Sequence, residues 1–418
     1  MLDHLIKEKK ARVAVVGLGY VGLPTAIAIA EAGFKTVGID INEQRVKQLN
    51  NNRSFIAEIS NESIKKVSGN FYASTDWNEI KKCNVIIVAV PTPLTKNKAP
   101  DTSFIENAAK NIASNLKPET LVILESTTYP GTTEELVRPI LPKCYLAFAP
   151  ERIDPGNKQY KLQNVPKVVG GIDKQSTELA CSFYSNFVEK VIPVSSPATA
   201  EMVKLLENVF RLVNISMINE LKMLADKMHI DMYEVIEAAK TTPYGFMAFY
   251  PGPGAGGHCI PLDPFYLSWK ARELGFFARF IELAGEINEL MPHYVVTKII
   301  SALNHKRKAI NGSKILVLGV AYKKDIDDSR ESPSLEVIKD LMGKKAQVIY
   351  NDPHIPQIEI DGGKIYSTPL TTEILKKVDC VAILTDHSSY DYPTIIKKAK
   401  LIVDIRNATK ISRDNIIK

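Results

Sequence analysis

The sequence predicts an α/β protein in which two open, doubly wound domains are joined by a central helical domain with a long helix. Over about the first 200 residues, short apolar runs alternate with helical patterns, which is typical of a parallel sheet covered by helices. The pattern then becomes helical, and the alternation of strand and helix returns from Gly312. The predicted domains are residues 1–199, 200–308 and 309–418.

The first domain is predicted to open with a strand, a helix and a second strand. Arg12–Val16 is a short apolar run, and residues 23–32 have the apolar spacing of a helix that ends before Gly33. Residues 36–39 form the next predicted strand. Further short apolar runs predict later strands, at residues 85–90, 121–125, 146–149 and 167–169.

The middle of the chain is predicted to be helical. A long helix is expected from Ala200 to about Met228, and its apolar residues occupy most faces, so we expect it to be buried against something large. A shorter helix is expected at residues 232–240, and more helix from 265 to about 303. The segment between them, TTPYGFMAFYPGPGAGGHCIPLDP, is rich in proline and glycine and predicts a loop.

The last domain repeats the opening of the chain in weaker form. Residues 314–320 predict a strand, 334–342 a helix and 346–350 a strand that runs into Asn351 and Asp352. The stretch ILVLGVA…QVIYND is similar to VAVVGLG…TVGID near the N-terminus. We interpret it as a second, degenerate copy of a nucleotide-binding half-fold that lacks the full set of glycines.

Composition excludes several classes of function. The chain has 418 residues, 45% hydrophobic and 24% charged, as in a soluble globular protein. Its net charge of +6 comes from scattered basic residues, so we expect no nucleic-acid partner. The most apolar long stretch, 202–218, is interrupted by polar residues, and no apolar leader follows Met1, so we expect no association with a membrane. Five cysteines without a CxxC motif argue against disulfides and structural zinc, and favour a cytoplasmic protein.

A glycine motif follows the first strand and opens the first helix. Gly17, Gly19 and Gly22 have the spacing G-x-G-x-x-G, with Tyr20 and Val21 between the last two. In a dinucleotide site the first glycine permits the tight turn, the second lets the pyrophosphate approach the backbone, and the third lets helix and sheet pack closely. Such a motif can also be a mere tight turn, but strand, glycines, helix and second strand follow here in order. The motif therefore predicts a Rossmann-like cofactor site.

An acidic residue indicates which dinucleotide is bound. Asp40 ends the second strand, 18 residues after Gly22. A carboxylate at this place accepts hydrogen bonds from the adenosine ribose and repels a 2′-phosphate, which predicts NAD rather than NADP. FAD-binding proteins share the glycine fingerprint, so the motif alone does not choose between NAD and FAD.

One cysteine lies in an unusual concentration of glycine. The loop G-P-G-A-G-G-H-C ends at Cys259, and its glycines permit positive φ angles and a close approach of a ligand to the backbone. An isolated cysteine is more often a small buried side chain, which is the interpretation for the other four. The glycine loop favours a reactive thiol at Cys259. Asp263, four residues on, is either a group that handles water and protons or a turn-forming residue before Pro264.

Four polar residues recur at helical spacing on the long central helix. Glu201, Lys204, Asn208 and Arg211 form one stripe of an otherwise apolar helix. Such a stripe is commonly a solvated face. A lysine and an asparagine four residues apart also suit the stabilisation of an oxyanion. The spacing alone leaves both interpretations open.

Seven segments together resemble the UDP-glucose/GDP-mannose dehydrogenase family, in the family's order and over nearly the whole chain. They are GLGYVGLP, VAVPTPLT, ESTTYPGTTEE, FAPERIDPGN, AEMVKLLENVFR, PGPGAGGHCIPLDP and GVAYKKDIDDSRESPS. The resemblance implies an NAD-dependent, four-electron oxidation of a nucleotide sugar at C6. It also implies a UDP-sugar substrate, a last domain that holds UDP, and a homodimer formed through the long helix.

The resemblance assigns roles to individual residues. Cys259 would add to an intermediate aldehyde, Lys204 and Asn208 would hold the C6 oxygen, and Asp263 would support the transfer of protons and water. Thr127 and Glu151 would position water and substrate. Lys323 and Arg330 would reach the UDP and the cofactor. The implied contacts extend to further residues: Pro91 and Thr92 for the cofactor, and Arg152, Arg211, Tyr250 and Gly256 for the substrate.

The choice of sugar depends on two loops. The GGHC loop and the segment PERIDPGN look like the UDP-N-acetylglucosamine 6-dehydrogenase branch, while UDP-N-acetylmannosamine dehydrogenases share GGHCI and UDP-glucose is a third alternative. The family's second glutamate after the PE pair is missing, and Asp154 is a weak substitute. Two other classes remain: a two-electron dehydrogenase without a nucleophilic cysteine, and a protein that senses NAD or a nucleotide sugar without turnover.

Overall fold

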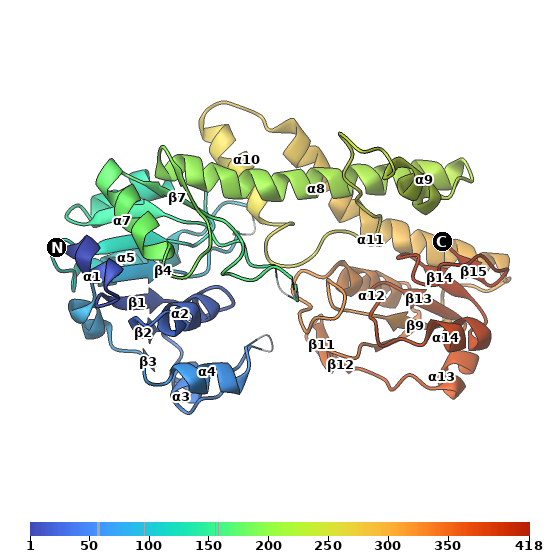
Figure 1. The fold of residues 1–418 in the computed structure, drawn as a ribbon. Coiled ribbons are helices and arrows are strands. Elements are labelled where there is room, and N and C mark those ends of the chain that lie inside the picture. The colour runs from blue at the N-terminus through green and yellow to red at the C-terminus, as the bar shows by residue number, and fades with distance from the viewer. Residues whose placement is uncertain (57–58, 96, 155, 158) are drawn as a thin grey trace. The chain divides into compact units, whose positions relative to one another are not determined.

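The structure is a computed structural model that describes residues 1–418 except 57, 58, 96, 155 and 158. The chain forms two compact units (Figure 1). The first unit comprises Met1–Glu207 and Phe265–Phe277, and the second comprises Asn208–Pro264 and Ala278–Lys418. Each unit contains its own sheet of mainly parallel strands, which confirms the predicted α/β class with a helical middle.

The first unit is built on an eight-stranded sheet in the order β3-β2-β1-β4-β5-β6-β7-β8. All neighbours are parallel except β6 and β7. The strand order reverses between β1 and β4, and this is where open α/β sheets bind ligands at the carboxyl ends of their strands. The strands are β1 (Arg12–Val16), β2 (Lys35–Ile39), β3 (Phe71–Ser74), β4 (Val85–Val88), β5 (Leu121–Leu124), β6 (Tyr145–Phe148), β7 (Lys167–Gly171) and β8 (Val191–Val194).

Helices cover both faces of this sheet because its strands are apolar on both sides. One apolar cluster joins the sheet to α1 (Leu2–Lys7), α2 (Gly22–Glu31), α3 (Glu43–Asn50), α4 (Asn61–Val67) and α7 (Lys174–Tyr184). The opposite cluster joins it to η1 (Trp77–Lys82), α5 (Ser103–Ala113), η2 (Thr133–Val137), α6 (Arg138–Ile140) and the start of α8 (Pro197–Lys227).

The N-terminal segment differs from the expectation that it leads straight into a strand. Residues Leu2–Lys7 form α1, which packs against α7. Leu2 and Ile6, four residues apart, are buried on one side of this short helix. Six residues are too few for a helical period to be distinguished in the sequence, so packing against α7 decides the conformation.

The long helix α8 is as long as predicted, but one of its faces is not buried within the chain. Leu206, Phe210, Met217, Leu221 and Leu224 are 40–58% exposed. These residues recur at intervals of three, four or seven and therefore form one stripe of the helix. We expected most faces of α8 to be buried. Only the opposite side is buried, and the polar stripe predicted from the sequence lies largely on that side.

The remaining helices of the middle region are α9 (Met232–Ala239), α10 (Asp263–Glu273) and α11 (Arg279–His305). They match the predicted helical stretches within a few residues. No helix in the described part of the chain is long and apolar enough to cross a membrane.

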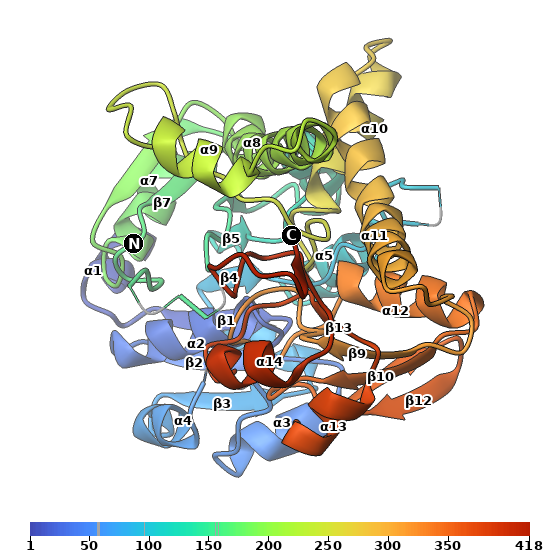
Figure 2. The same cartoon turned by 90° about the vertical axis from the view of Figure 1, so that its right-hand side faces the viewer.

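The second unit contains a five-stranded parallel sheet in the order β10-β9-β13-β14-β15. Figure 2 labels β9, β10 and β13 of this sheet. Helices α11 and α12 (Pro333–Gly343) cover one face, and α13 (Thr372–Lys377) and α14 (Tyr392–Lys398) cover the other. The strands are β9 (Lys314–Leu318), β10 (Gln347–Asn351), β13 (Cys380–Ile383), β14 (Ile402–Asp404) and β15 (Ile416–Ile417), and β11 (Gln357–Ile360) pairs with β12 (Gly363–Tyr366) in a separate hairpin.

The two sheets have the same first turn, which confirms the internal resemblance seen in the sequence. Gly17 has φ of +89° and Gly319 has φ of +85°, so each occupies a conformation that favours glycine. The next residue in each turn donates its backbone N–H to an aspartate at the end of the neighbouring strand. Leu18 N lies 2.9 Å from Oδ2 of Asp40, and Val320 N lies 2.7 Å from the corresponding oxygen of Asp352.

Candidate active site

The glycine turn of the first unit fits a dinucleotide pyrophosphate. A Cβ at Gly17 would lie 2.6 Å from the carbonyl oxygen of Ala89, and one at Gly22 would collide with the carbonyl of Gly17. A Cβ at Gly19 would meet nothing within 4 Å, so this glycine leaves open space beside the backbone. Helix α2 begins at Gly22, and its N-cap residue Val21 has no side chain that accepts from the N–H groups of the first turn. That N-terminus is therefore available to an anion.

Asp40 directly follows β2 and lies beside the glycine turn. Its side chain is largely buried at the end of β2, with Oδ2 accepting from Leu18 N and Oδ1 accepting from Asn42 N, each over 2.9 Å. A guanidinium nitrogen of Arg45 lies 4.0 Å from Oδ2, and Arg45 also stacks over the ring of Phe55. Arg45 was not predicted from the sequence. The signal in the sequence that could have identified Arg45 is its position in the first turn of α3, five residues after Asp40.

The structure brings Thr92 and Thr127 together at the carboxyl ends of β4 and β5. The hydroxyl of Thr92 donates to the carbonyl oxygen of Thr127 over 2.7 Å, and Tyr266 donates to the carbonyl of Thr92. Pro91 is exposed beside them. Tyr20 and Val21 lie in the glycine turn, Tyr20 exposed and Val21 half-buried. These residues therefore border the same end of the sheet as the glycine turn.

Lys204 and Glu151 also meet within the first unit. The ammonium of Lys204 donates to the backbone carbonyl of Glu151 over 2.7 Å, and both side chains are more than nine-tenths buried. Arg152 forms an ion pair with Glu207 and donates to the carbonyl of Pro166 over 2.8 Å. The stripe on α8 is thus not a solvated face at Lys204.

Glu201, on the same stripe, has a structural role. Its carboxylate accepts from Gly131 N over 2.6 Å and from the backbone and hydroxyl of Thr133 over 2.9 and 2.6 Å. These contacts tie α8 to the loop after β5. Burial raises the pKa of Glu201 to about 7, against the effect of its hydrogen bonds.

Cys259 is the exposed cysteine of the five. Cys83 and Cys380 are buried, Cys144 and Cys181 are half-buried, and burial raises the pKa of all four thiols. The carbonyl of Cys259 accepts from Asp263 N over 2.8 Å, which places the cysteine in the turn that leads into α10. The interpretation of the other four as packing residues and of Cys259 as accessible agrees with this burial.

The glycine-rich loop packs on the segment that contains Lys323 and Arg330. Gly257 N donates to the carbonyl of Arg330 over 3.2 Å. A Cβ at Gly256 would lie 2.8 Å from the side chain of Pro333, and one at Gly257 would lie 2.7 Å from the ring of Tyr322. Small residues are required here because two backbone segments lie against each other. The second unit therefore brings the Cys259 loop next to this segment.

Asn208 and Asp263 form a buried pair in the second unit. The amide nitrogen of Asn208 donates to Oδ2 of Asp263 over 2.6 Å, and both side chains are almost fully buried. Among the described residues, Oδ1 of Asn208 has no hydrogen-bond partner. A buried polar oxygen without a protein partner is uncommon and favours a ligand that donates to it.

The remaining expected contacts are more dispersed. Arg330 pairs with Asp328 over 2.7 Å, and Lys323 is half-buried. Arg211 is exposed, and the hydroxyl of Tyr250 donates to Glu237 over 2.6 Å. The exposed Asp154 accepts from Asn157 over 3.0 Å.

His258 is a further residue of this loop, and no role was predicted for it from the sequence. It is half-buried next to Cys259. Burial, reinforced by the charge of Arg330, lowers the pKa of its imidazole, which favours the neutral form at neutral pH. Its position beside the thiol, within the GGHC motif, was the signal that could have identified it.

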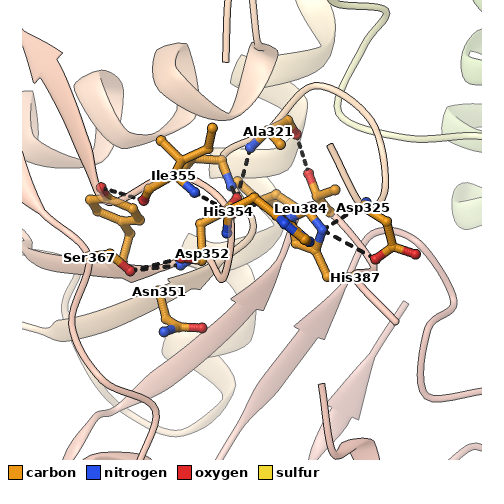
Figure 3. A network of polar contacts seen from close by, with 12 residues as sticks. Ala321, Asp325, Asn351, Asp352, His354, Ile355, Ser367, Leu384 and His387 are labelled. Atoms are coloured by element: carbon orange, nitrogen blue, oxygen red, sulfur yellow. Dashed lines mark hydrogen bonds and ion pairs between the residues drawn. The ribbon is translucent and has the colours of Figure 1, made fainter. Parts of the chain in front are cut away.

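In the second half-fold the counterpart of Asp40 is covered by a histidine (Figure 3). Nε2 of His387 lies 3.0 Å from Oδ2 of Asp352, and Asp325 N donates to Nδ1 of the same ring over 3.0 Å. Burial opposes ionisation of Asp352, but hydrogen bonds from His387 and from the backbone lower its pKa to about 2. His354, Asp325 and His387 have potential metal ligands within 4.8 Å of one another, but the hydrogen bonds already engage both nitrogens of His387. We interpret the network as the support of the loop that contains Lys323.

Known proteins share the sequence patterns of this chain. The NAD binding domain of the UDP-glucose/GDP-mannose dehydrogenase family matches residues 11–188, its central domain matches 198–290, and its UDP binding domain matches 316–411.

Individual relatives cover nearly the whole chain. A UDP-N-acetyl-D-mannosamine dehydrogenase of Methanococcus vannielii is 35% identical over 97% of this chain and 95% of its own length. A UDP-N-acetyl-D-glucosamine 6-dehydrogenase of Pseudomonas aeruginosa is 34% identical over 91% of this chain and 92% of its own. The solved structure of a UDP-D-ManNAc dehydrogenase from Pyrococcus horikoshii has a TM-score of 0.87 at 34% identity, covering 97% of this chain and 98% of that one.

Proposed function

Since the chain belongs to the UDP-glucose/GDP-mannose dehydrogenase family and is an NAD-dependent dehydrogenase of UDP-sugars, we propose that it oxidises the C6 hydroxyl of a UDP-N-acetylhexosamine to a carboxylate. The observation that carries the proposal is the accessible thiol of Cys259 in a glycine loop, while the other four thiols are wholly or partly buried. A two-electron dehydrogenase does not require such a group.

In the proposed reaction NAD+, when bound, accepts one hydride in each of two oxidations. Cys259 acts between them: its thiolate adds to the C6 aldehyde to give a thiohemiacetal, and the second oxidation converts this adduct to a thioester. Water then displaces the thiolate, releasing the carboxylic acid and restoring Cys259. Per sugar, two NAD+ are reduced and one water is consumed.

The residues proposed to bind NAD and those proposed to act on the C6 oxygen have distinct roles. Gly17–Gly22, Asp40, Thr92 and Thr127 would bind NAD, with Arg45 beside the adenosine. Asn208 would accept a hydrogen bond from the C6 hydroxyl through its unpartnered Oδ1, and Lys204 would stabilise the oxygen as negative charge develops on it. Asp263, which the Asn208 amide orients, would exchange protons with water.

The substrate-binding roles of the other residues follow the same division. Glu151 and Arg152 at the end of β6, with Lys204, would contact the sugar from the first unit. Lys323, on the loop supported by Asp352 and His387, would contact the UDP, and Arg330 would contact the cofactor. We propose the domain division 1–199 for NAD, 200–308 for the central helices and 309–418 for UDP, in keeping with the three family patterns.

The sugar is proposed to be an N-acetylhexosamine because the relatives named for such sugars cover nearly all of this chain. We propose UDP-N-acetylglucosamine first, from the GGHCIP and PERIDPGN segments, and UDP-N-acetylmannosamine as the alternative. UDP-glucose is the third candidate.

The test is the yield of NADH per mole of sugar, measured with limiting UDP-GlcNAc, UDP-ManNAc or UDP-glucose and excess NAD. Two NADH and a uronic acid product with an N-acetylated sugar support the proposal, and a higher kcat/KM identifies the preferred C2 configuration. One NADH per sugar contradicts a four-electron reaction. No NADH with any of the three favours a sensor without turnover.

We also propose that the enzyme is a homodimer formed through α8. The exposed stripe of this helix includes Phe210, Met217 and Leu221, which are 46%, 45% and 40% exposed. On α11, Phe280 and Leu283 are 77% and 52% exposed. Large apolar side chains gathered along one helix are typical of an interface between subunits.

A further inference from the structure

A lysine is buried between two carboxylates behind the loop that contains Glu151. The ammonium of Lys167, the first residue of β7, lies 2.7 Å from Oε1 of Glu125 and 3.3 Å from Oε2 of Glu151. All three side chains are more than nine-tenths buried. Burial alone would lower the pKa of Lys167, but the charges of the two glutamates outweigh it and raise that pKa. The two glutamates therefore favour the ammonium form of Lys167.

Glu125, on the far side of the ammonium, is held in place by two further groups. The hydroxyl of Tyr184 donates to its Oε1 over 2.6 Å, and the hydroxyl of Thr25 donates to its Oε2 over 3.3 Å. Thr25 belongs to α2, the helix that follows the glycine turn. The ammonium of Lys167 also lies 5.0 Å from the centre of the Tyr184 ring. The position of Lys167 is thus fixed from two helices and two strands.

Glu151, on the near side, has each of its oxygens engaged. Oε1 accepts from Arg152 N over 2.6 Å, Oε2 faces Lys167, and the backbone carbonyl accepts from Lys204. The charged groups that face Glu151 in the described residues are Lys167 from β7, Glu125 from the end of β5, Lys204 from α8, and the neighbouring Arg152. Arg152 is itself neutralised by Glu207. Lys167 is therefore the buried counter-ion of the Glu151 carboxylate.

We propose that Lys167 is a positioning residue for Glu151: it holds that carboxylate in its orientation, and so fixes the carbonyl that holds Lys204. The inference rests on the proposed function, in which Glu151 and Lys204 act on the sugar. Here Lys167 orients Glu151, and Glu151 orients Lys204. Such chains of three groups recur in catalytic sites. A buried ion pair does not by itself show that the pair stabilises the fold, because apolar side chains of similar volume often stabilise a protein equally well.

Variants of Lys167 and Glu125 distinguish a positioning role of Lys167 from a role in neutralising buried charge alone. Lys167→Met alone would leave two buried carboxylates without a cation and risks unfolding the protein. The variant Glu125→Gln/Lys167→Met removes one carboxylate together with the cation, and Glu125→Gln serves as its reference. We expect the double variant to fold, to retain its KM for NAD, and to lose about tenfold or more in kcat.

The pH profile gives a readout that a structural role would not change. The double variant removes the positive charge that lies 3.3 Å from the Glu151 carboxylate, so the acid limb of kcat in Glu125→Gln/Lys167→Met should move to higher pH than in Glu125→Gln. Glu125→Gln/Lys167→Arg restores the positive charge and should return the limb toward its original place. An unchanged limb in the methionine variant would overturn the proposal and leave Lys167 a structural residue.

A second measurement does not depend on activity. In the Glu125→Gln background, Lys167→Met and Glu151→Gln are made singly and together, and unfolding by urea is measured. We expect the two changes to be coupled by about tenfold or more in the unfolding equilibrium constant. Additive effects would show that Lys167 does not hold Glu151, and would reject the inference. Absence of NADH formation by the wild-type protein would instead reject the proposed function, while the coupling still decides whether Lys167 holds Glu151.

Discussion

The amide of Asn208, on α8, donates to the carboxylate of Asp263, the first residue of α10, over 2.6 Å. The two residues are far apart in the sequence, and both are almost fully buried. The hydrogen bond holds the side chain of Asp263, which follows Cys259 by four residues in the chain. Oδ1 of Asn208 has no partner among the described residues. The pair is the point at which the long helix and the cysteine loop meet within the second unit.

Replacement of Asn208 should affect catalysis more than folding. Asn208→Ala removes the acceptor of the proposed C6 hydroxyl and the donor that orients Asp263, so kcat should fall by about 100-fold, as for the loss of a group that positions a proton transfer. Asn214→Ala, two turns further along α8, is the matched control and should keep kcat. Steady-state rates and thermal unfolding of both variants check this. An equal loss of activity in the two variants would point to damage to the helix.

Replacement of the proposed nucleophile should stop acid formation while substrate binding persists. Cys259→Ser removes the thiolate that forms the covalent adduct but changes the volume little. Uronic acid should fall to background in product analysis, and UDP-sugar binding by calorimetry should stay close to wild type. Cys181→Ser, a half-buried cysteine on α7, is the control. Undiminished acid formation by Cys259→Ser would reject the mechanism.

The choice of NAD over NADP should depend on Asp40. Asp40→Ala removes the carboxylate that accepts from the ribose, and a hydrogen bond to a charged group contributes roughly 1.5–3 kcal/mol. The KM for NAD should therefore rise about tenfold or more. The KM for NADP should fall, because the repulsion of the 2′-phosphate is gone and Arg45 remains nearby. An unchanged ratio of the two KM values would refute the assignment of Asp40.

The pH dependence of stability should include a contribution from Glu201. Burial raises its folded-state pKa to about 7 from an ordinary value of 4.5. A carboxyl group with a raised pKa stabilises the fold fully below its unfolded pKa, and this stability is lost as pH rises toward 7. The loss between about pH 4 and pH 8 should amount to roughly 3 kcal/mol, at about 1.4 kcal/mol per pKa unit.

The variant Glu201→Gln is neutral throughout and should lack this decline. Urea unfolding of wild type and variant across that pH range measures the difference between their unfolding free energies. The difference should change in favour of the variant as pH rises. Parallel pH dependences of the two proteins would show that Glu201 is not protonated in this range.

The oligomeric state should depend on the exposed stripe of α8. Phe210→Asp/Leu221→Asp places two charges in the proposed apolar interface, where an unpaired charge is costly to bury. Light scattering should give the mass of a monomer for this variant and of a dimer for the wild type. Lys174→Asp, an exposed change on α7, should leave the mass of the dimer unchanged. If the variant with both aspartates still has the mass of a dimer, the interface lies elsewhere.

Local signals in the sequence identified much of the fold and part of the site. The glycine turn, the strand before it and Asp40 were recognisable because each needs particular residue types at fixed short spacing. Strand β1 matches its predicted residues, and α8 begins and ends within a few residues of the prediction. The accessibility of Cys259 was also inferred locally, because the glycines that expose it are its neighbours in the chain.

The tertiary structure alone decided which polar residues are buried and what they contact. The sequence left the stripe of Glu201, Lys204 and Asn208 between a solvated face and a functional one, because helical spacing does not say what covers a face. Lys167 appeared only as the start of a strand, although two glutamates distant in the sequence surround its ammonium. Glycine turns and helix periods depend on neighbours in the chain. Burial, ion pairing and pKa depend on groups that only folding brings within a few ångströms.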